Sequence, residues 1–350
     1  MKRLFILFIA VAIMAVSCKK DNNNTPDNSL GDGVFVLNQG NFNSANASLS
    51  YFKPSGNTIT NDLFFSVNHV PLGDVAQSIT SLGNTSYLVV NNSGLVYVID
   101  NRTAKVLGSI TGLSSPRYML LINENKAYIT DLYSTGITII NPSTYEITGT
   151  VDVGRTTEEI VMVGNKAFAA NWSAFGQTVK NNKILVVDTQ QDVFVDSIQV
   201  GVEPNSLVVD KDNNVWVLCS GGYDNEEYPT LWKIDALTHQ TVDTLTFAKL
   251  KSSPDNLNIN GTGDMLYFLN KGVYQFSIDS TALPAEPFIK EQSNRHFSYL
   301  GIDPVSGDIY ASDPLDYQLN GFIYRFKENG ITLSKNEAGI VPGAFGFNYH

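Results

Sequence analysis

A seven-bladed β-propeller, an all-β ring of four-stranded blades, is the architecture that this 350-residue sequence predicts. The first observation is a repeat between residues 33 and 350, in which six segments each begin with an apolar strand, a tight polar turn and a second strand. The second is a spacing of 40, 41, 47, 50 and 43 residues between their apolar anchors, which are Ile79, Met119, Ile160, Leu207, Leu257 and Leu300. Repeats of this length with several short strands are typical of propeller blades.

The two ends of the repeat predict how the ring closes. The segment GVFVLNQ at 33–39 has the pattern of a second strand without a first, and PGAFGFN at 342–348 has the pattern of a first strand without a second. We therefore expect the C-terminal strand to be the innermost strand of the blade that the N-terminal strands begin. This pairing gives seven blades and removes the open edge of the ring. An open β-sandwich, the alternative, leaves the two partial repeats unexplained.

The N-terminal residues predict a targeting segment and a tether. Lys2 and Arg3 precede an apolar run at 4–16 that is too short to span a bilayer comfortably, and small residues then lead to Cys18. This arrangement resembles a bacterial lipobox, so residues 1–17 are predicted to be a lipoprotein signal peptide and Cys18 the lipidated residue. An ordinary secretory signal with a chance cysteine is the alternative. Residues 18–32 are polar and patternless, which predicts a flexible tether before the propeller at 33–350.

Composition argues against several classes of function. Without residues 1–17, the chain has 21 lysines and arginines against 34 aspartates and glutamates, a formal net charge of −13. That charge argues against nucleic acid as a partner, and against contact with a membrane except through the lipid anchor. The remaining cysteine, Cys219, ends the strand VWVLC and is expected to be a buried apolar residue. The four histidines fall at unrelated repeat positions, and no catalytic motif is present, so we expect neither metal nor cofactor.

The turns predict which face of the ring binds a ligand. In an up-and-down blade with strands A to D, the A–B turns lie on one face, and the B–C loops and D–A crossings lie on the other. The A–B turns are short, whereas several B–C loops exceed what a hairpin needs, and long loops on a rigid scaffold are where binding usually resides. Local packing within a loop is the alternative for any one aromatic residue. The B–C loops contribute the candidate aromatic contacts Phe42, Tyr133, Trp172, Phe175, Tyr223 and Tyr317.

The D–A crossings add a polar inner ring on the same face. Its members precede the apolar anchors by one or two residues and are expected to rim the mouth of the central channel. A water-filled polar mouth is the alternative. A polar floor within an aromatic rim suits a large ligand with a flat apolar body and many amides or hydroxyls. The candidate polar contacts are Gln77, Arg117, Glu158, Asn205, Asp255 and Asn256.

Two family resemblances extend these expectations. The blade strands at 96–110 and 184–198 resemble those of YncE-like propellers, which implies only the fold. The lipoprotein start together with GVFVLNQGNFNSANASLSYF (33–52), NWSAFG (171–176) and DPLDY (313–317) resembles Bacteroidetes surface lipoproteins of the BtuG type. That resemblance implies a non-enzymatic outer-membrane lipoprotein, exposed at the cell surface, that binds cobalamin as a ligand and passes it to a TonB-dependent transporter. A propeller enzyme (a lactonase, lyase or dehydrogenase) and a protein- or glycan-docking module remain the alternatives.

The lipobox assignment predicts the effect of removing its cysteine. Replacing Cys18 with alanine removes the thiol to which lipid would be attached, so we expect a protein that is soluble in the periplasm or left unprocessed. Cell fractionation with a lipid label measures both properties. A Cys18→Ala protein that stays labelled and bound to the outer membrane contradicts the assignment.

Overall fold

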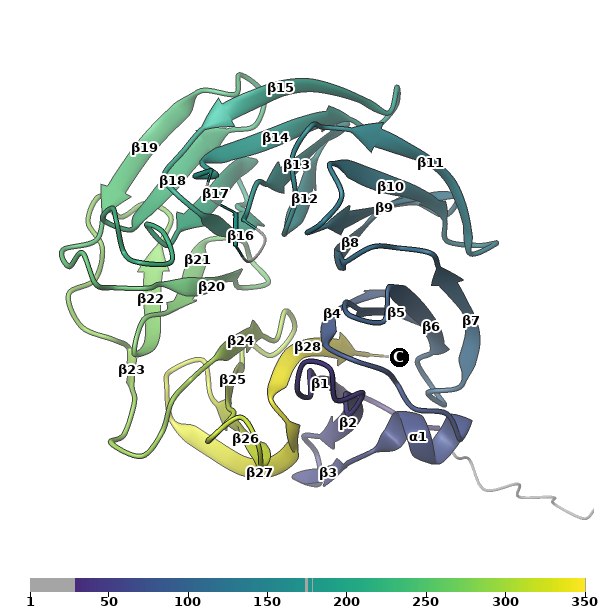
Figure 1. The fold of residues 1–350 in the computed structure, drawn as a ribbon. Coiled ribbons are helices and arrows are strands. Elements are labelled where there is room, and N and C mark those ends of the chain that lie inside the picture. Colours follow the sequence, from purple (N-terminus) through teal and green to yellow (C-terminus); the bar gives the residue numbers. More distant parts are fainter. Residues whose placement is uncertain (1–28, 174–175, 178, 350) are drawn as a thin grey trace, which may run out of the picture.

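Seven antiparallel sheets, each of four strands, form a closed ring, as the sequence predicts (Figure 1). The computed structural model describes residues 29–173, 176–177 and 179–349. Each sheet is one blade, and its strands run outward from the centre of the ring in order along the chain, except in the blade that joins the two ends. The prediction of a seven-bladed propeller is confirmed.

The strand bounds follow the repeat. From the innermost strand outward, blades 1 to 3 contain β28 (Pro342–Asn348), β1 (Gly33–Asn38), β2 (Ser48–Lys53) and β3 (Thr58–Thr60); β4 (Ala76–Leu82), β5 (Thr85–Val90), β6 (Leu95–Asp100) and β7 (Val106–Thr111); and β8 (Pro116–Asn123), β9 (Lys126–Asp131), β10 (Gly136–Asn141) and β11 (Glu146–Asp152). Blades 4 and 5 contain β12 (Ile160–Val163), β13 (Lys166–Ala170), β14 (Lys183–Asp188) and β15 (Val193–Gln199); and β16 (Pro204–Val209), β17 (Asn214–Cys219), β18 (Thr230–Asp235) and β19 (Thr241–Thr246). Blades 6 and 7 contain β20 (Asp255–Ile259), β21 (Met265–Leu269), β22 (Gly272–Ser277) and β23 (Ile289–Lys290); and β24 (Tyr299–Ile302), β25 (Ile309–Asp313), β26 (Asn320–Phe326) and β27 (Thr332–Ile340).

The C-terminal strand closes the ring. In blade 1, β28 pairs antiparallel with β1, with Val36 opposite Phe345 and Gly33 opposite Asn348. The closing strand also lies against the innermost strand of the next blade, because a Cβ atom at Gly346 would come within 2.6 Å of the Ile79 Cδ1 atom. Glycine is therefore the residue that fits here, and the anchor of blade 2 packs directly on the closing strand.

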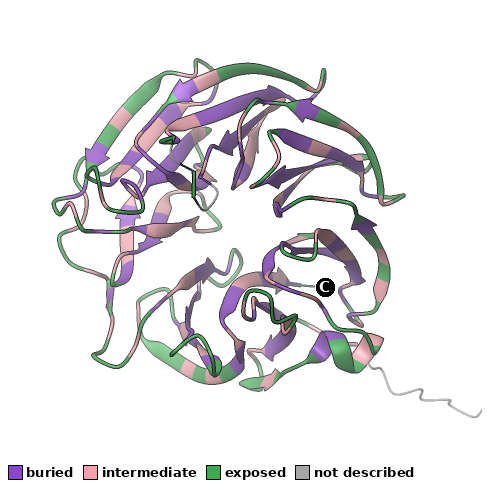
Figure 2. Cartoon of the chain, viewed as in Figure 1, coloured by how far each residue is buried: buried purple, intermediate pink, exposed green. Residues whose placement is uncertain are grey.

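Burial follows the position of a strand within its blade (Figure 2). The second strands are covered by neighbouring blades on both faces and are nearly continuously apolar; all six residues of β1 are buried. The outermost strands face solvent, so β15 buries only one of its seven residues. The core is made between blades: one cluster joins Phe168 and Val186 of blade 4 to Leu207 and Val217 of blade 5. Cys219 is buried in the same cluster, as predicted.

Turn residues recur at the ends of the third strands. In each of Asp100, Asn141, Asp188 and Asp235, the side-chain Oδ1 atom accepts hydrogen bonds from the backbone N–H groups two and three residues further on. This local bonding shapes the turn that follows the strand. The recurrence of these residues at the same place in successive repeats therefore marks turns.

A short helix departs from the all-strand pattern. Helix α1 (Leu63–Asn68) lies between β3 and β4 and buries Leu63 and Phe64. The Phe64 ring packs 4.9 Å from the Tyr97 ring of blade 2, centroid to centroid. Six residues are too few to show helical periodicity, so the sequence does not reveal this element. In the described part of the chain, no helix has the length and apolar character needed to cross a membrane.

The closure predicts the effect of removing the last strand. Deleting residues 342–350 strips the innermost strand from blade 1 and exposes a ring-breaking edge, so we expect a loss of several kcal/mol in the free energy of unfolding. Thermal melts compare this truncation with a matched deletion of residues 19–28, which belong to the predicted tether and should leave the melting temperature unchanged. An unchanged melt after removal of 342–350 contradicts closure by β28.

Candidate ligand-binding site

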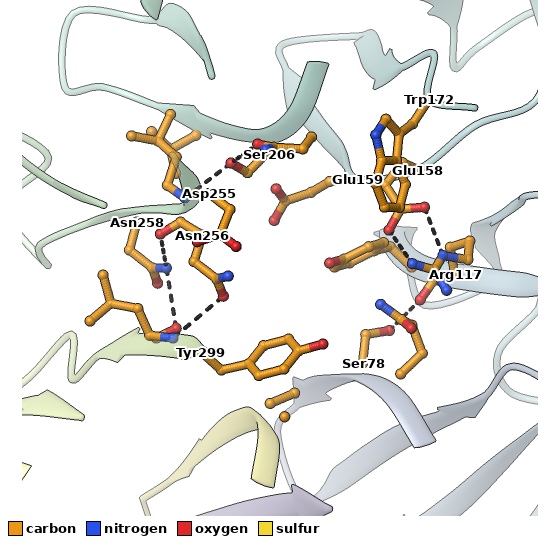
Figure 3. A pocket seen from close by; sticks show the side chains of 18 of the residues that line it. Ser78, Arg117, Glu158, Glu159, Trp172, Ser206, Asp255, Asn256, Asn258 and Tyr299 are labelled. Carbon is orange, nitrogen blue, oxygen red and sulfur yellow. Dashed lines mark hydrogen bonds and ion pairs between the residues drawn. The ribbon is translucent and has the colours of Figure 1, made fainter. Parts of the chain in front are cut away.

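A cavity of about 650 Å³ opens where the inner strands meet the B–C loops (Figure 3). Its lining combines inner-strand residues, such as Ser78 and Asn256, with loop residues, such as Trp172 and Tyr223. B–C loops and D–A crossings therefore contribute to one hollow. This agrees with the face that the turn lengths predict.

The floor of the cavity is held together by hydrogen bonds between neighbouring blades. Each innermost strand pairs with its own second strand along one edge, and its other edge has no strand partner. Polar side chains one residue before the anchors bond instead to the backbone of the next inner strand, which satisfies these edge groups. Such bonds run from Ser78 Oγ to the Arg117 carbonyl (2.6 Å), from Leu207 N–H to Glu159 Oε2 (2.7 Å), from Leu257 N–H to Ser206 Oγ (3.0 Å) and from Asn256 Nδ2 to the Ser298 carbonyl (3.1 Å).

An ion pair joins blades 3 and 4 at the same level. Arg117 donates from Nε and Nη2 to the two carboxylate oxygens of Glu158, both at 2.7 Å. Both side chains are largely buried, with 11% and 4% of their surfaces exposed. Burial raises the pKa of the Glu158 carboxyl, and the guanidinium of Arg117 opposes that rise. The two-pronged geometry fixes the guanidinium plane and leaves its face available for stacking.

Aromatic rings stand above this ion pair. Trp172 stacks on Tyr223 with ring centroids 5.9 Å apart and an angle of 25° between the planes. The Arg117 guanidinium lies 5.9 Å from the centroid of the Trp172 ring, within the range of a cation–π contact. We call Arg117, Glu158, Trp172 and Tyr223 the aromatic wall. Its members come from the crossings and B–C loops of three blades, 3, 4 and 5.

A buried glutamate holds the loop that carries Trp172. Glu203, only 4% exposed, accepts a hydrogen bond from the Ser173 N–H at 2.9 Å and another from the Ser173 hydroxyl. The Tyr223 hydroxyl donates to the Ser173 carbonyl at 3.2 Å, and the Thr156 hydroxyl donates to the Trp172 carbonyl at 2.7 Å. The candidate set from the sequence omits Glu203. The signal that could have found it is a carboxylate directly before Pro204, at the start of an inner strand.

Two further carboxyl groups line the cavity with raised pKa values. Burial raises the pKa of Glu159 to about 8; the Leu207 N–H opposes the rise and the neighbouring Glu158 adds to it. Burial likewise raises the pKa of Asp255 to about 7, opposed by a hydrogen bond with Asn256 and reinforced by Glu291. Near neutral pH, the floor therefore carries less negative charge than its carboxyl count implies.

A tyrosine at the start of β24, in blade 7, closes the floor. The Gln39 side chain donates to the Tyr299 hydroxyl. Gly343 makes this contact possible, because a Cβ atom there would come within 2.7 Å of Gln39 Cγ. Burial raises the pKa of Tyr299 to about 12, so its phenol is neutral at physiological pH and both donates and accepts hydrogen bonds. Gln39, which is also absent from the candidate set, lines the hollow that adjoins this cavity.

The structure brings together most of the candidate residues. Two of them, Phe42 and Tyr317, line an adjoining hollow of about 530 Å³, which Asp255 also lines. Tyr133 is 65% exposed and lines neither hollow, because its short loop turns back through hydrogen bonds from the Tyr133 and Ser134 N–H groups to Asp131. Phe175 and Cys18 lie outside the described residues. The candidates that line the larger cavity are Gln77, Arg117, Glu158, Trp172, Asn205, Tyr223, Asp255 and Asn256.

The site contains no recognisable metal centre within the described ranges. No group of three or more histidine, cysteine, aspartate or glutamate side chains there is placed to hold an ion. What the geometry offers is a large open cavity with a rigid aromatic wall and a hydrogen-bonding floor. Such a cavity suits binding of a sizeable ligand that carries both flat and polar parts.

The family model of a domain of unknown function, DUF5074, matches residues 32–339. The chain therefore belongs to the DUF5074 family, and the match covers almost the whole of the described seven-bladed ring. No curated protein matches it significantly.

Solved structures resemble the chain in fold. A quinonprotein alcohol dehydrogenase-like protein from Bacteroides thetaiotaomicron has a TM-score of 0.70 and 17% identity, covering 91% of this chain and 79% of that one. A periplasmic gluconolactonase from Pseudomonas aeruginosa has a TM-score of 0.64 and 13% identity, covering 90% and 98%. Apo AztD from Citrobacter koseri has a TM-score of 0.58 and 11% identity, covering 89% and 96%. At these identities, the likeness shows the propeller fold alone.

The raised pKa of Glu159 predicts a pH dependence of stability. Above pH 4.5, the unfolded carboxyl ionises while the folded one keeps its proton up to about pH 8, so the free energy of unfolding falls across this interval. Glu159→Gln cannot ionise and keeps an oxygen for the Leu207 N–H. We expect it to remove up to a few kcal/mol of this fall.

Urea unfolding at pH 5 and pH 8.5 measures the difference between the parent and Glu159→Gln. The exposed Glu124, in an A–B turn on the opposite face, supplies the control substitution Glu124→Gln, which should keep the parent's pH dependence. Equal pH slopes for the parent and Glu159→Gln contradict the prediction.

Proposed function

We propose that this protein is a cell-surface lipoprotein that binds a corrinoid of the cobalamin class, without changing it chemically, and passes it to a TonB-dependent outer-membrane transporter. The observation that carries the proposal is the preassembled aromatic wall above a hydrogen-bonding floor. A corrin is a broad, largely apolar disc fringed with amides, so one ligand would use both surfaces.

The aromatic wall supports tight binding because it is already ordered. Trp172 is stacked on Tyr223, and the peptide groups beside it are fixed by Thr156 and Glu203. A ligand that stacks or lies edge-on against these rings would lose little free energy to ordering them, and a small ordering cost permits high affinity. We therefore expect a dissociation constant in the nanomolar range or below.

The polar floor supports recognition of amides. Asn205, Asp255 and Asn256 line the cavity with donors and acceptors, although the Asn205 side chain already donates to the Pro254 carbonyl at 3.0 Å. Each amide and carboxyl group has more than one bonding position, so a group engaged between blades retains capacity for a ligand. Arg117 and Glu158 add two charged side chains to the lining, and their opposite charges compensate each other.

One observation favours an enzyme as the second candidate. Glu159 and Asp255, with pKa values of about 8 and about 7, line one cavity, and carboxyls with such values serve as general acids or bases in other enzymes. Recovering the corrinoid after prolonged incubation and comparing its spectrum and mass with the starting compound separates the two. An altered ligand favours the enzyme.

The proposal predicts a calorimetric result with purified protein. Titration with cyanocobalamin should give saturable heat with a dissociation constant in the nanomolar range or tighter. Trp172→Ala removes the centre of the aromatic wall and should weaken binding by roughly 30-fold or more, which corresponds to about 2 kcal/mol.

The matched controls are Phe194→Ala, an aromatic truncation on the outermost strand β15, and Asn125→Ala in an A–B turn; both should bind like the parent. No heat at micromolar concentrations for cobalamin or its precursors contradicts the corrinoid proposal and favours a docking module. A large loss in Asn125→Ala would mean that the ligand binds on the other face.

A further inference from the structure

The second hollow adjoins the cavity that contains the aromatic wall. Ser253, Asp255, Ser298 and Tyr299 line both, so these residues form a shared border. The second hollow, of about 530 Å³, extends from that border over blades 6, 7 and 1, between the B–C loops that carry Phe42 and Tyr317 and the crossings that lead into blades 6 and 7. One ligand with two parts can therefore occupy both hollows.

Positive charge gathers in the second hollow. Lys251 and Lys271 line it and are exposed, and His296 lies beside them. In the described part of the chain, no carboxylate lies within ion-pair distance of either lysine, although the protein as a whole has a formal net charge of −11. Two lysines without carboxylate partners in one hollow of an acidic protein favour an anionic ligand group.

The acidic groups that face this hollow do not cancel that charge. Asp255 is a lining residue, but burial raises its pKa to about 7, so a large share of it is protonated near neutral pH. Glu291 lies 3.7 Å from the His296 ring through Oε1, and the same oxygen accepts the Phe297 N–H at 2.8 Å. Glu291 thus interacts with His296 and the Phe297 backbone and not with either lysine.

Aromatic side chains accompany the lysines. Phe42 is 67% exposed and Tyr317 is 45% exposed, and both line the hollow. The Tyr317 backbone carbonyl accepts a hydrogen bond from the Asn41 side chain, and its hydroxyl lies 3.3 Å from the Ser298 hydroxyl. These contacts fix one ring while leaving its surface open, which suits stacking against a planar heterocycle.

We propose that the second hollow is a subsite for a phosphodiester bearing a planar heterocycle, with Lys251 and Lys271 binding the phosphate and Phe42 and Tyr317 contacting the ring. This inference rests on the proposed function: the subsite receives the nucleotide tail of a corrinoid whose disc lies against the aromatic wall. Recognition is then divided, with the disc bound in the first cavity and the tail selected in the second.

Two corrinoids that differ in the tail test this division. Cyanocobalamin contains the phosphodiester and the heterocycle, and dicyanocobinamide lacks both. The double variant Lys251→Gln/Lys271→Gln should weaken cyanocobalamin binding by about tenfold or more, because it removes charge-assisted hydrogen bonds to the phosphate, and should change cobinamide binding by less than about twofold. Titration at two salt concentrations should show a smaller salt dependence for cyanocobalamin in the variant.

The matched control is Lys105→Gln/Lys211→Gln, which removes the same charge from exposed turns on the opposite face and should bind both compounds like the parent. Equal loss of both corrinoids in the Lys251/Lys271 variant, or loss of neither, overturns the subsite and leaves the proposed function standing. A parent protein that binds cobinamide but not cobalamin also overturns the subsite and leaves the proposed function standing. A parent that binds neither overturns both proposals.

Discussion

The inner edges of the blades impose the constraint on which this structure depends. A sheet edge has backbone N–H and C=O groups that need partners, and an innermost strand has no further strand beside it. Side chains one residue before the anchor, such as Ser206 and Asn256, supply these partners by hydrogen bonding to the backbone at the next inner strand. The polar ring around the channel is therefore first of all a means of joining blades, and its positions repeat because the edges repeat.

The role of these polar side chains in joining blades determines which groups are available to bind a ligand. Ser206 bonds to the Leu257 N–H, and Arg117 and Glu158 satisfy each other, so the floor is rigid before any ligand arrives. The aromatic wall is built on top of that floor: Arg117, fixed by Glu158, lies beside the Trp172 ring, which stacks on Tyr223. Moving any one of these groups would disturb a bond between two blades. The stiffness of the site is thus inherited from the closure of the ring.

The sequence revealed what repeats and missed what does not. The anchors, the alternation of turns and the two partial repeats predicted the ring, its closure by β28 and the face with the long loops, because each of these recurs or completes a recurrence. The Arg117–Glu158 ion pair could have been predicted, because opposite charges occupy the same position in successive repeats, 41 residues apart. Helix α1 could not be predicted, because six residues show no helical period. Glu203 supports one loop of one blade, so its only signal in the sequence is its place directly before Pro204. Tyr133 differs from the other described aromatic candidates: its loop turns back through a hydrogen bond to Asp131, and its side chain lines neither hollow.

Burial at the mouth of the channel makes its charge less negative than the sequence suggests. Glu158 is compensated by Arg117, while Glu159 and Asp255 have pKa values of about 8 and about 7 and so retain much of their protonation near neutral pH. An acidic protein thereby presents a mouth with little net negative charge, bordered by Lys251 and Lys271. A ligand whose disc is fringed with neutral amides and whose tail is anionic therefore meets less repulsion in these hollows than the acidic composition suggests. As Asp255 loses its proton with rising pH, negative charge develops at the border that both hollows share, so electrostatic repulsion grows beside the anionic part of such a ligand.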